Sequence, residues 1–219
     1  MNGTTKHLDG KSFILLLFLA FFLKNCQKNE ERNFSNLLEL KNYTIKKTKI
    51  NDSIIGIVGE NKNYKIKGLF NTQSNEKIGW WKIVDTANDN DFDIEYVSPK
   101  FPKENQMKIY KKGILQKDLS MYYDYTLTKH KFLLKIYYPK SSEIIDKVSF
   151  DYITGDTIKK MRINDGKVEC IFKNDCYECE IPISVDENAI SGIAAIFTYK
   201  ENKKDVTLGN TNMYVKTKK

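Results

Sequence analysis

Apolar and polar residues alternate along most of the chain after residue 42. In Tyr64–Phe70, for example, lysines separate aromatic and β-branched residues. Because successive side chains of a strand point to opposite faces of a sheet, this alternation predicts strands with one buried face. Short segments rich in Asn, Asp and Gly lie between them and predict turns. The strands predicted up to residue 128 are Tyr43–Lys49, Ile54–Val58, Tyr64–Phe70, Gly79–Asp85, Phe92–Ser98, Gln106–Lys111 and Met121–Leu127.

Residues 129–219 show the same alternation in a second series of short segments. Short strands at this spacing, joined by Gly, Asn and Asp turns, are typical of an immunoglobulin-like sandwich. We therefore predict an all-β protein. An N-terminal β-hairpin/meander module over 42–128 is followed by an immunoglobulin-like antiparallel sandwich over 129–219. The strands predicted for the sandwich are Lys131–Tyr138, Ile144–Ile153, Thr157–Ile163, Lys167–Phe172, Tyr177–Ile183, Ile190–Tyr199 and Asn212–Lys216.

The amino end has no such alternation. A polar segment with Lys6 and Lys11 precedes the continuous apolar run Ser12–Leu23. A helix over this run is about 18 Å long, whereas the core of a bilayer is about 30 Å thick. A basic segment followed by a short apolar run is typical of a secretory signal, so we predict export. A membrane-anchoring or buried helix is the alternative.

Cys26 follows this run in the sequence Leu23-Lys-Asn-Cys26, and Gln27-Lys-Asn-Glu-Glu31 comes next. These residues resemble the cleavage site and the Lys-plus-acidic export tract of Bacteroidota lipoproteins, with Lys24 and Asn25 in place of the usual small residues. The resemblance implies a signal peptide over 1–25, a lipid on Cys26 that includes palmitate, and a tether over 26–41. It also implies a lipid-anchored location in the outer membrane or at the cell surface. A free cysteine in a polar linker is the alternative.

The segments Tyr64-Lys-Ile-Lys-Gly68 and Gly79-Trp80-Trp81-Lys82 resemble a degenerate MORN-type repeat, over about 20 residues. The segment from Asn105 to Gly113 is similar to a hairpin of uncharacterised flavobacterial lipoproteins. Both resemblances imply a binding or spacer role and supply no catalytic residue.

Trp80 and Trp81 are the most unusual aromatic pair. As neighbours on a strand they point to opposite faces, so we expect one indole in the core and the other partly exposed. The exposed ring either covers the sheet surface or forms an aromatic contact for a glycan or a partner protein.

Three cysteines lie in the predicted sandwich. Pairing the strands on either side of the Asn174-Asp175 turn places Cys170 opposite Cys179, which permits a disulfide in an oxidising envelope. Two buried free thiols are an alternative. A metal site at Cys176-x-x-Cys179 is another, although zinc needs more ligands than this region offers. We expect Cys176 at the turn, exposed and unpaired.

The charge and the histidine content argue against several further classes of function. Only two of the 36 basic residues are Arg, and the net charge of +8 falls to +6 once the signal is removed. Few arginines and no long basic block argue against nucleic-acid binding. His130 is the only histidine beyond the signal, so we expect no catalytic triad, metal or cofactor. The acid pairs Asp93/Glu95 and Asp151/Asp156 resemble ordinary surface acids.

The functional expectation is therefore a lipid-anchored cell-envelope protein with a non-enzymatic binding or structural role. Its partners are the membrane, through the N-terminal lipid, and a protein or a glycan. One alternative is an immunity or inhibitor lipoprotein that neutralises a secreted toxin. A carboxylate-based envelope hydrolase is the other, and it predicts a deep cleft with two acids about 5–10 Å apart.

Overall fold

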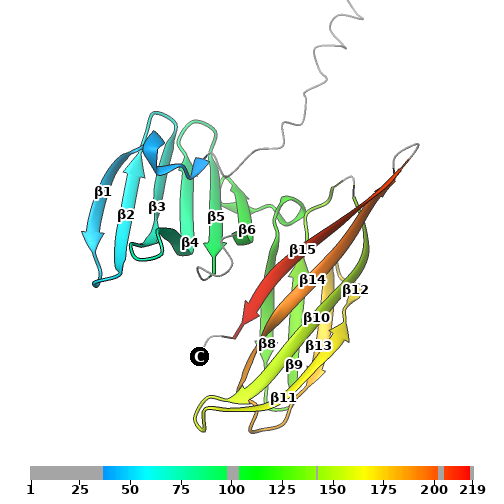
Figure 1. The fold of residues 1–219 in the computed structure, drawn as a ribbon. Coiled ribbons are helices and arrows are strands. Elements are labelled where there is room, and N and C mark those ends of the chain that lie inside the picture. Colours follow the sequence, from blue (N-terminus) through cyan, green and yellow to red (C-terminus); the bar gives the residue numbers. More distant parts are fainter. Residues whose placement is uncertain (1–36, 98–103, 142, 202–204, 218–219) are drawn as a thin grey trace, which may run out of the picture. The chain divides into compact units, whose positions relative to one another are not determined.

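The computed structural model describes residues 37–97, 104–141, 143–201 and 205–217, and these residues form almost only β-strands (Figure 1). The predicted all-β fold is confirmed. Leu40–Lys219 form one compact unit. The predicted signal peptide, Cys26 and the tether up to residue 36 lie outside the described residues. In the described part of the chain, no helix is long and apolar enough to cross a membrane.

The first module is an antiparallel meander sheet in which each strand pairs with the next. Its first three hairpin turns are closed by Asn51, Asn61 and Asn71. Each side-chain oxygen accepts hydrogen bonds from the backbone N–H groups two and three residues later. Asn favours turns for this reason. The strands are β1 (Thr44–Lys49), β2 (Ile54–Glu60), β3 (Tyr64–Asn71), β4 (Glu76–Asp85), β5 (Asn90–Tyr96), β6 (Glu104–Lys111) and β7 (Ile114–Leu115).

One face of the meander sheet is buried around Trp81, which is 0% exposed. The indole lies against the backbone of Gly68, where a Cβ atom would be only 2.2 Å from Cδ2 of Trp81. Its Nε1 donates a hydrogen bond to the carbonyl oxygen of Leu69, at 3.0 Å. The segments that contain Gly68 and Trp81 therefore pack together on β3 and β4, and Gly68 is required because any side chain would displace the indole.

The second module is an antiparallel sandwich of two four-stranded sheets, with the orders β11-β10-β14-β15 and β12-β13-β9-β8 (Figure 1). Fully buried side chains from both sheets fill its core, including Phe132 and Phe150, whose ring centroids are 6.2 Å apart. The predicted sandwich is confirmed. Its strands are β8 (Tyr122–Leu127), β9 (Lys131–Tyr137), β10 (Ile144–Asp156), β11 (Met161–Glu169), β12 (Ile171–Lys173), β13 (Cys176–Pro182), β14 (Ala189–Glu201) and β15 (Val206–Lys216).

The predicted strands Thr157–Ile163 and Lys167–Phe172 are wrong. Asp156 accepts hydrogen bonds from the backbone N–H groups two and three residues later, so a turn occupies 157–160. β11 then continues through the polar stretch that we expected to separate two strands. After Cys170 the chain enters the other sheet as β12. Hydrophobic alternation is weak in β11 because its side chains are mostly exposed.

The boundary between the modules lies before Tyr122 and not near residue 128. β8 pairs along its length with β9 and is therefore a strand of the sandwich. β6 is linked to Met121, the residue before β8, by a bridge in which Met107 and Met121 exchange two backbone hydrogen bonds, of 2.6 and 2.8 Å. Because β8 shows the same alternation as the meander strands, the pattern alone did not assign it to a sheet.

Candidate functional site

A groove crosses the open face of the meander sheet and receives residues from β1 to β5. Its volume is about 460 Å³. Trp80, Val58 and Leu69 give it apolar surface, and Val58 and Leu69 are 51% and 39% exposed. Lys67 and Lys82 add positive charge. An apolar hollow with a few charged groups is the usual character of a binding site.

A row of residues that face each other on neighbouring strands runs through this groove. We call this row the lysine row. Neighbouring strands are about 4.8 Å apart, so a row across six strands is about 24 Å long. Lys67 and Lys82 face each other directly. Like charges in this position destabilise a sheet by roughly 0.2–1 kcal/mol, so folding alone does not favour them. From β1 to β6 the row consists of Lys46, Val58, Lys67, Lys82, Asp93 and Lys108.

Acidic side chains balance only part of this charge. Nζ of Lys82 lies 3.5 Å from a carboxylate oxygen of Asp91. Burial raises the pKa of Asp93, while the charge of Lys82 acts in the opposite direction. Within the described residues, Lys46 and Lys67 form no ion pair. The end of the row at β1 to β3 therefore carries uncompensated positive charge.

The two adjacent tryptophans lie on opposite faces of the sheet. Trp81 is in the core, and Trp80 is half-buried and lines the groove. Nζ of Lys108 is 5.6 Å from the ring centroid of Trp80 and 4.9 Å from that of Tyr122. Tyr122 stacks on Tyr137, with centroids 4.4 Å apart. Lys108 thus makes cation–π contacts with both Trp80 and the stacked Tyr122, while Trp80 also lines the groove.

A buried polar network lies at the junction of the two modules. Oε2 of Glu95 accepts hydrogen bonds from the side-chain amides of Asn105 and Gln106, at 2.8 and 2.7 Å. Gln106 also accepts from the backbone N–H of Tyr123, and Asn105 bonds both the N–H and the carbonyl of Tyr214. β6 is thereby joined to β8 and to β15, one strand from each sheet of the sandwich.

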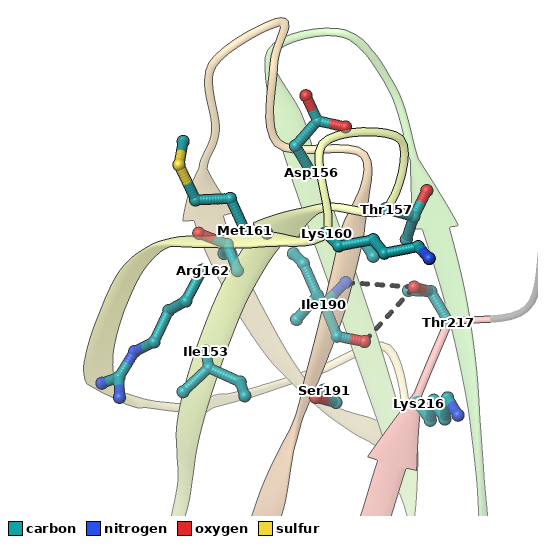
Figure 2. Close-up of a pocket in the computed structure, with 13 residues that line it drawn as sticks. Ile153, Asp156, Thr157, Lys160, Met161, Arg162, Ile190, Ser191, Lys216 and Thr217 are labelled. Carbon is teal, nitrogen blue, oxygen red and sulfur yellow. Dashed lines mark hydrogen bonds between the residues drawn. The ribbon is translucent and has the colours of Figure 1, made fainter.

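A second hollow, of about 470 Å³, lies at the end of the β10–β11 hairpin (Figure 2). Ile153, Met161 and Ile190 contribute apolar surface, and Lys160 is one of the basic residues that line it. The hydroxyl of Thr217 accepts a hydrogen bond from the N–H of Ile190 and donates one to its carbonyl, at 3.0 and 3.2 Å. These bonds, drawn in Figure 2, fasten Thr217, which follows β15, to β14 beside the hollow.

The structure joins Cys170 and Cys179 by a disulfide, with Cα atoms 4.4 Å apart. Phe172 lies opposite Tyr177 in the ladder, which is the register that we expected around the turn. Both cysteines belong to the core of the sandwich.

Cys176 is buried, whereas we expected it to be exposed. It is 2% exposed, its thiol donates a hydrogen bond to the carbonyl of Lys173 at 3.3 Å, and burial raises its pKa. Because the sulfur of Cys179 is bonded to Cys170, it is not available to bind a metal together with Cys176. In the described ranges, no three His, Cys, Asp or Glu residues gather closely enough to hold a metal ion.

The acids that we considered for hydrolysis have structural contacts. The carboxylate of Glu95 is held by two amides in the junction network. Asp151 pairs with Lys167 at 3.2 Å. Asp156 closes the turn after β10, and hydrogen bonds from that turn lower its pKa despite the opposing effect of desolvation. Each candidate pair therefore has at least one member engaged in holding the fold.

Sequence reasoning singled out Trp80 but missed the lysines beside it. Lys46, Lys67 and Lys82 are far apart in the sequence, and only the strand register places them in one row. Every second residue of a strand shares a face, but counting from the β3–β4 turn would pair Lys67 with Trp80, because the register shifts between Lys67 and Leu69. Comparisons of this chain with protein-family models, with curated proteins and with solved structures find no match.

Proposed function

We propose that this protein is a non-enzymatic, lipid-anchored protein of the cell envelope that binds an acidic protein partner in the groove beside Trp80. One observation carries the proposal: Lys67 and Lys82 face each other in a groove that also exposes Val58 and Leu69. The two facing lysines destabilise the sheet, and an acidic ligand that neutralises their charge would account for their presence.

The apolar side chains favour a protein over a glycan as the partner. Aliphatic surface around a tryptophan resembles the centre of a protein interface, where a few aromatic residues supply most of the binding energy and charges lie at the rim. Trp80 is the aromatic residue that the groove offers for this role, and Lys67 and Lys82 supply the charge that would select an acidic partner. The lipid expected on Cys26 would keep the groove at the membrane surface, where it meets other envelope proteins.

The test is capture of binding proteins from the native envelope by the lipid-free chain from residue 27 onward. Mass spectrometry identifies what is captured, and calorimetry measures the affinity of the purified partner. We expect Trp80→Ala to weaken binding by about 30-fold, as is usual for a central aromatic residue. The charge reversal Lys67→Glu/Lys82→Glu should weaken binding by at least tenfold and reduce its dependence on salt.

A matched control is the double variant Lys173→Glu/Lys200→Glu, which changes the same charge at exposed positions of the sandwich. It should bind like the unchanged chain. Equal capture by all variants would contradict the proposal. Binding of polygalacturonate with the same sensitivity to Trp80 and the lysines would replace the protein partner by an acidic glycan. A tight complex with a single secreted toxin would identify an immunity protein.

The lipid anchor is tested separately, because it lies outside the described residues. Cells that express the full chain are grown with labelled palmitate, beside cells that express Cys26→Ser. We expect the label and membrane retention to be lost in the variant. Unchanged labelling of Cys26→Ser would refute lipidation at this cysteine and leave the groove untouched.

A further inference from the structure

We infer that the hollow at the end of the β10–β11 hairpin binds small organic anions that carry an alkyl chain. This site lies on the sandwich and shares no residue with the groove beside Trp80. The inference is therefore independent of the proposed function, and each can fail without the other.

The hollow lies beside an irregularity in the β10–β11 ladder. Thr154 pairs with Asn164 and Gly155 with Arg162, so Ile163 is an extra residue in β11. A Cβ atom at Gly155 would lie 2.8 Å from the carbonyl oxygen of Met161, so only glycine permits this close approach of the two strands. β-Bulges bend a strand and often occur beside binding sites. Here the bulge lies where the hairpin turns beside the hollow (Figure 2).

Two of the apolar side chains that line the hollow are accessible to a ligand. Ile153 is 44% exposed and Met161 is 54% exposed. The volume of about 470 Å³ lies within the range of small-ligand sites, about 300–1,000 Å³. An alkyl chain covering Ile153 and Met161 would remove this surface from water.

The charges around the hollow are mostly positive. Lys160, Arg162 and Lys216 come from a turn and two different strands and surround Ile190 in Figure 2. Arg162 has a partner in Asp165, at 2.7 Å. In the described part of the chain, Lys160 and Lys216 have no ion pair.

Asp156 is the one acidic residue that lines the hollow. Its Oδ1 accepts hydrogen bonds from two backbone N–H groups of the turn and from the amide of Asn188, and Oδ2 lies 3.6 Å from Nζ of Lys159. The negative charge of Asp156 is thus balanced by Lys159, and Asp156 forms no ion pair with Lys160 or Lys216. Apolar surface beside these two ammonium groups fits a ligand with an alkyl chain and an anionic head.

The experiment titrates the lipid-free chain with hexanoate, octanoate and decanoate and follows backbone amide shifts by NMR. Each added CH₂ group should raise the affinity about fourfold until the hollow is filled. Decyl phosphate is compared with decanoate, which separates a phosphate head, as in a phospholipid, from a carboxylate head, as in a fatty acid. Decanol and decyltrimethylammonium are the neutral and cationic controls, and both should bind at least tenfold more weakly than the better anion.

Two sets of variants locate the site. Lys160→Gln/Lys216→Gln should weaken binding of the anion about tenfold, and Met161→Gln should reduce the gain per CH₂ group. Lys147→Gln, at the far end of β10, and Lys67→Gln, in the groove, are controls that should leave the affinity unchanged. Absence of binding at millimolar decanoate and decyl phosphate would overturn the inference. Equal binding of decanol, or shifts confined to residues outside the hollow, would also overturn it.

Discussion

In the sandwich, side chains from two sheets meet in one core, whereas in the meander sheet only one face is buried. Phe132 and Phe150 show the first arrangement, because they come from opposite sheets and are both inaccessible to water. Trp81 and Trp80 show the second, because one indole lies in the core and its neighbour lines a groove. The same alternation of apolar and polar residues thus builds both modules. In the meander sheet, however, the side chains on the open face remain available to a ligand. Four predictions test this difference.

The largest expected effect is a difference in stability between substitutions of the two tryptophans. Trp81→Ala removes a fully buried indole and should lower the free energy of unfolding by about 3–5 kcal/mol, because a cavity replaces it. Trp80→Ala should lower it by less than about 1 kcal/mol, since the ring is half-buried and lies over the sheet surface. Urea unfolding followed by circular dichroism measures both. Similar losses for the two variants would contradict the assignment of Trp80 to ligand binding.

The second prediction concerns the disulfide of the sandwich. Cys170 and Cys179 are nine positions apart in the sequence, and closing a loop of this length stabilises a fold by about 2–3 kcal/mol. Cys170→Ala/Cys179→Ala should therefore lower the melting temperature of the sandwich. The paired strands of the meander sheet should keep their protection from hydrogen exchange under the same conditions. Equal loss of protection in both modules would show that they unfold as one unit.

The third prediction concerns the junction network. Gln106→Ala leaves the carboxylate of Glu95 with one donor fewer and the N–H of Tyr123 without its acceptor. We expect a loss of about 1–3 kcal/mol, because both groups belong to a buried network. In calorimetry, the unfolding transitions of both modules should shift to lower temperature, because the network contacts both of them. Transitions at unchanged temperatures would mean that the network does not couple the modules.

The smallest effect should be an increase in stability. Lys67→Gln removes the repulsion between two directly opposed lysines, so the free energy of unfolding should rise by roughly 0.2–1 kcal/mol. Lys173→Gln, an exposed lysine of the sandwich, is the control and should change little. Chemical unfolding measures both differences. A destabilised Lys67→Gln would show that the lysine is retained for folding.

The alternation of apolar and polar residues predicted most strands, but it did not show to which sheet each strand belongs. β8 pairs with β9 through backbone groups that every residue carries, so no side chain of Tyr122–Leu127 marks it as a sandwich strand. β11 was misplaced because its side chains are mostly exposed and carry no burial signal. The register of Phe172 with Tyr177 was predictable, because a short turn fixes which residues face each other.

The candidate site was predictable only in part. Trp80 attracts attention as an aromatic residue beside another, and alternation alone places it opposite Trp81. The lysine row depends on the register of five successive strand pairs, and the bulge at Gly68 alters the count between β3 and β4. Such irregularities come from tertiary packing, here of Trp81 on Gly68, and leave no periodic signal in the sequence.

The central claim is that the lysine row serves binding at the expense of stability. The most direct measurement is the affinity of the purified partner for Lys67→Gln and for the unchanged chain, titrated over a range of salt concentrations. We predict that Lys67→Gln binds more weakly at low salt and that the difference shrinks as salt screens the charges. Equal affinity at every salt concentration would contradict the account.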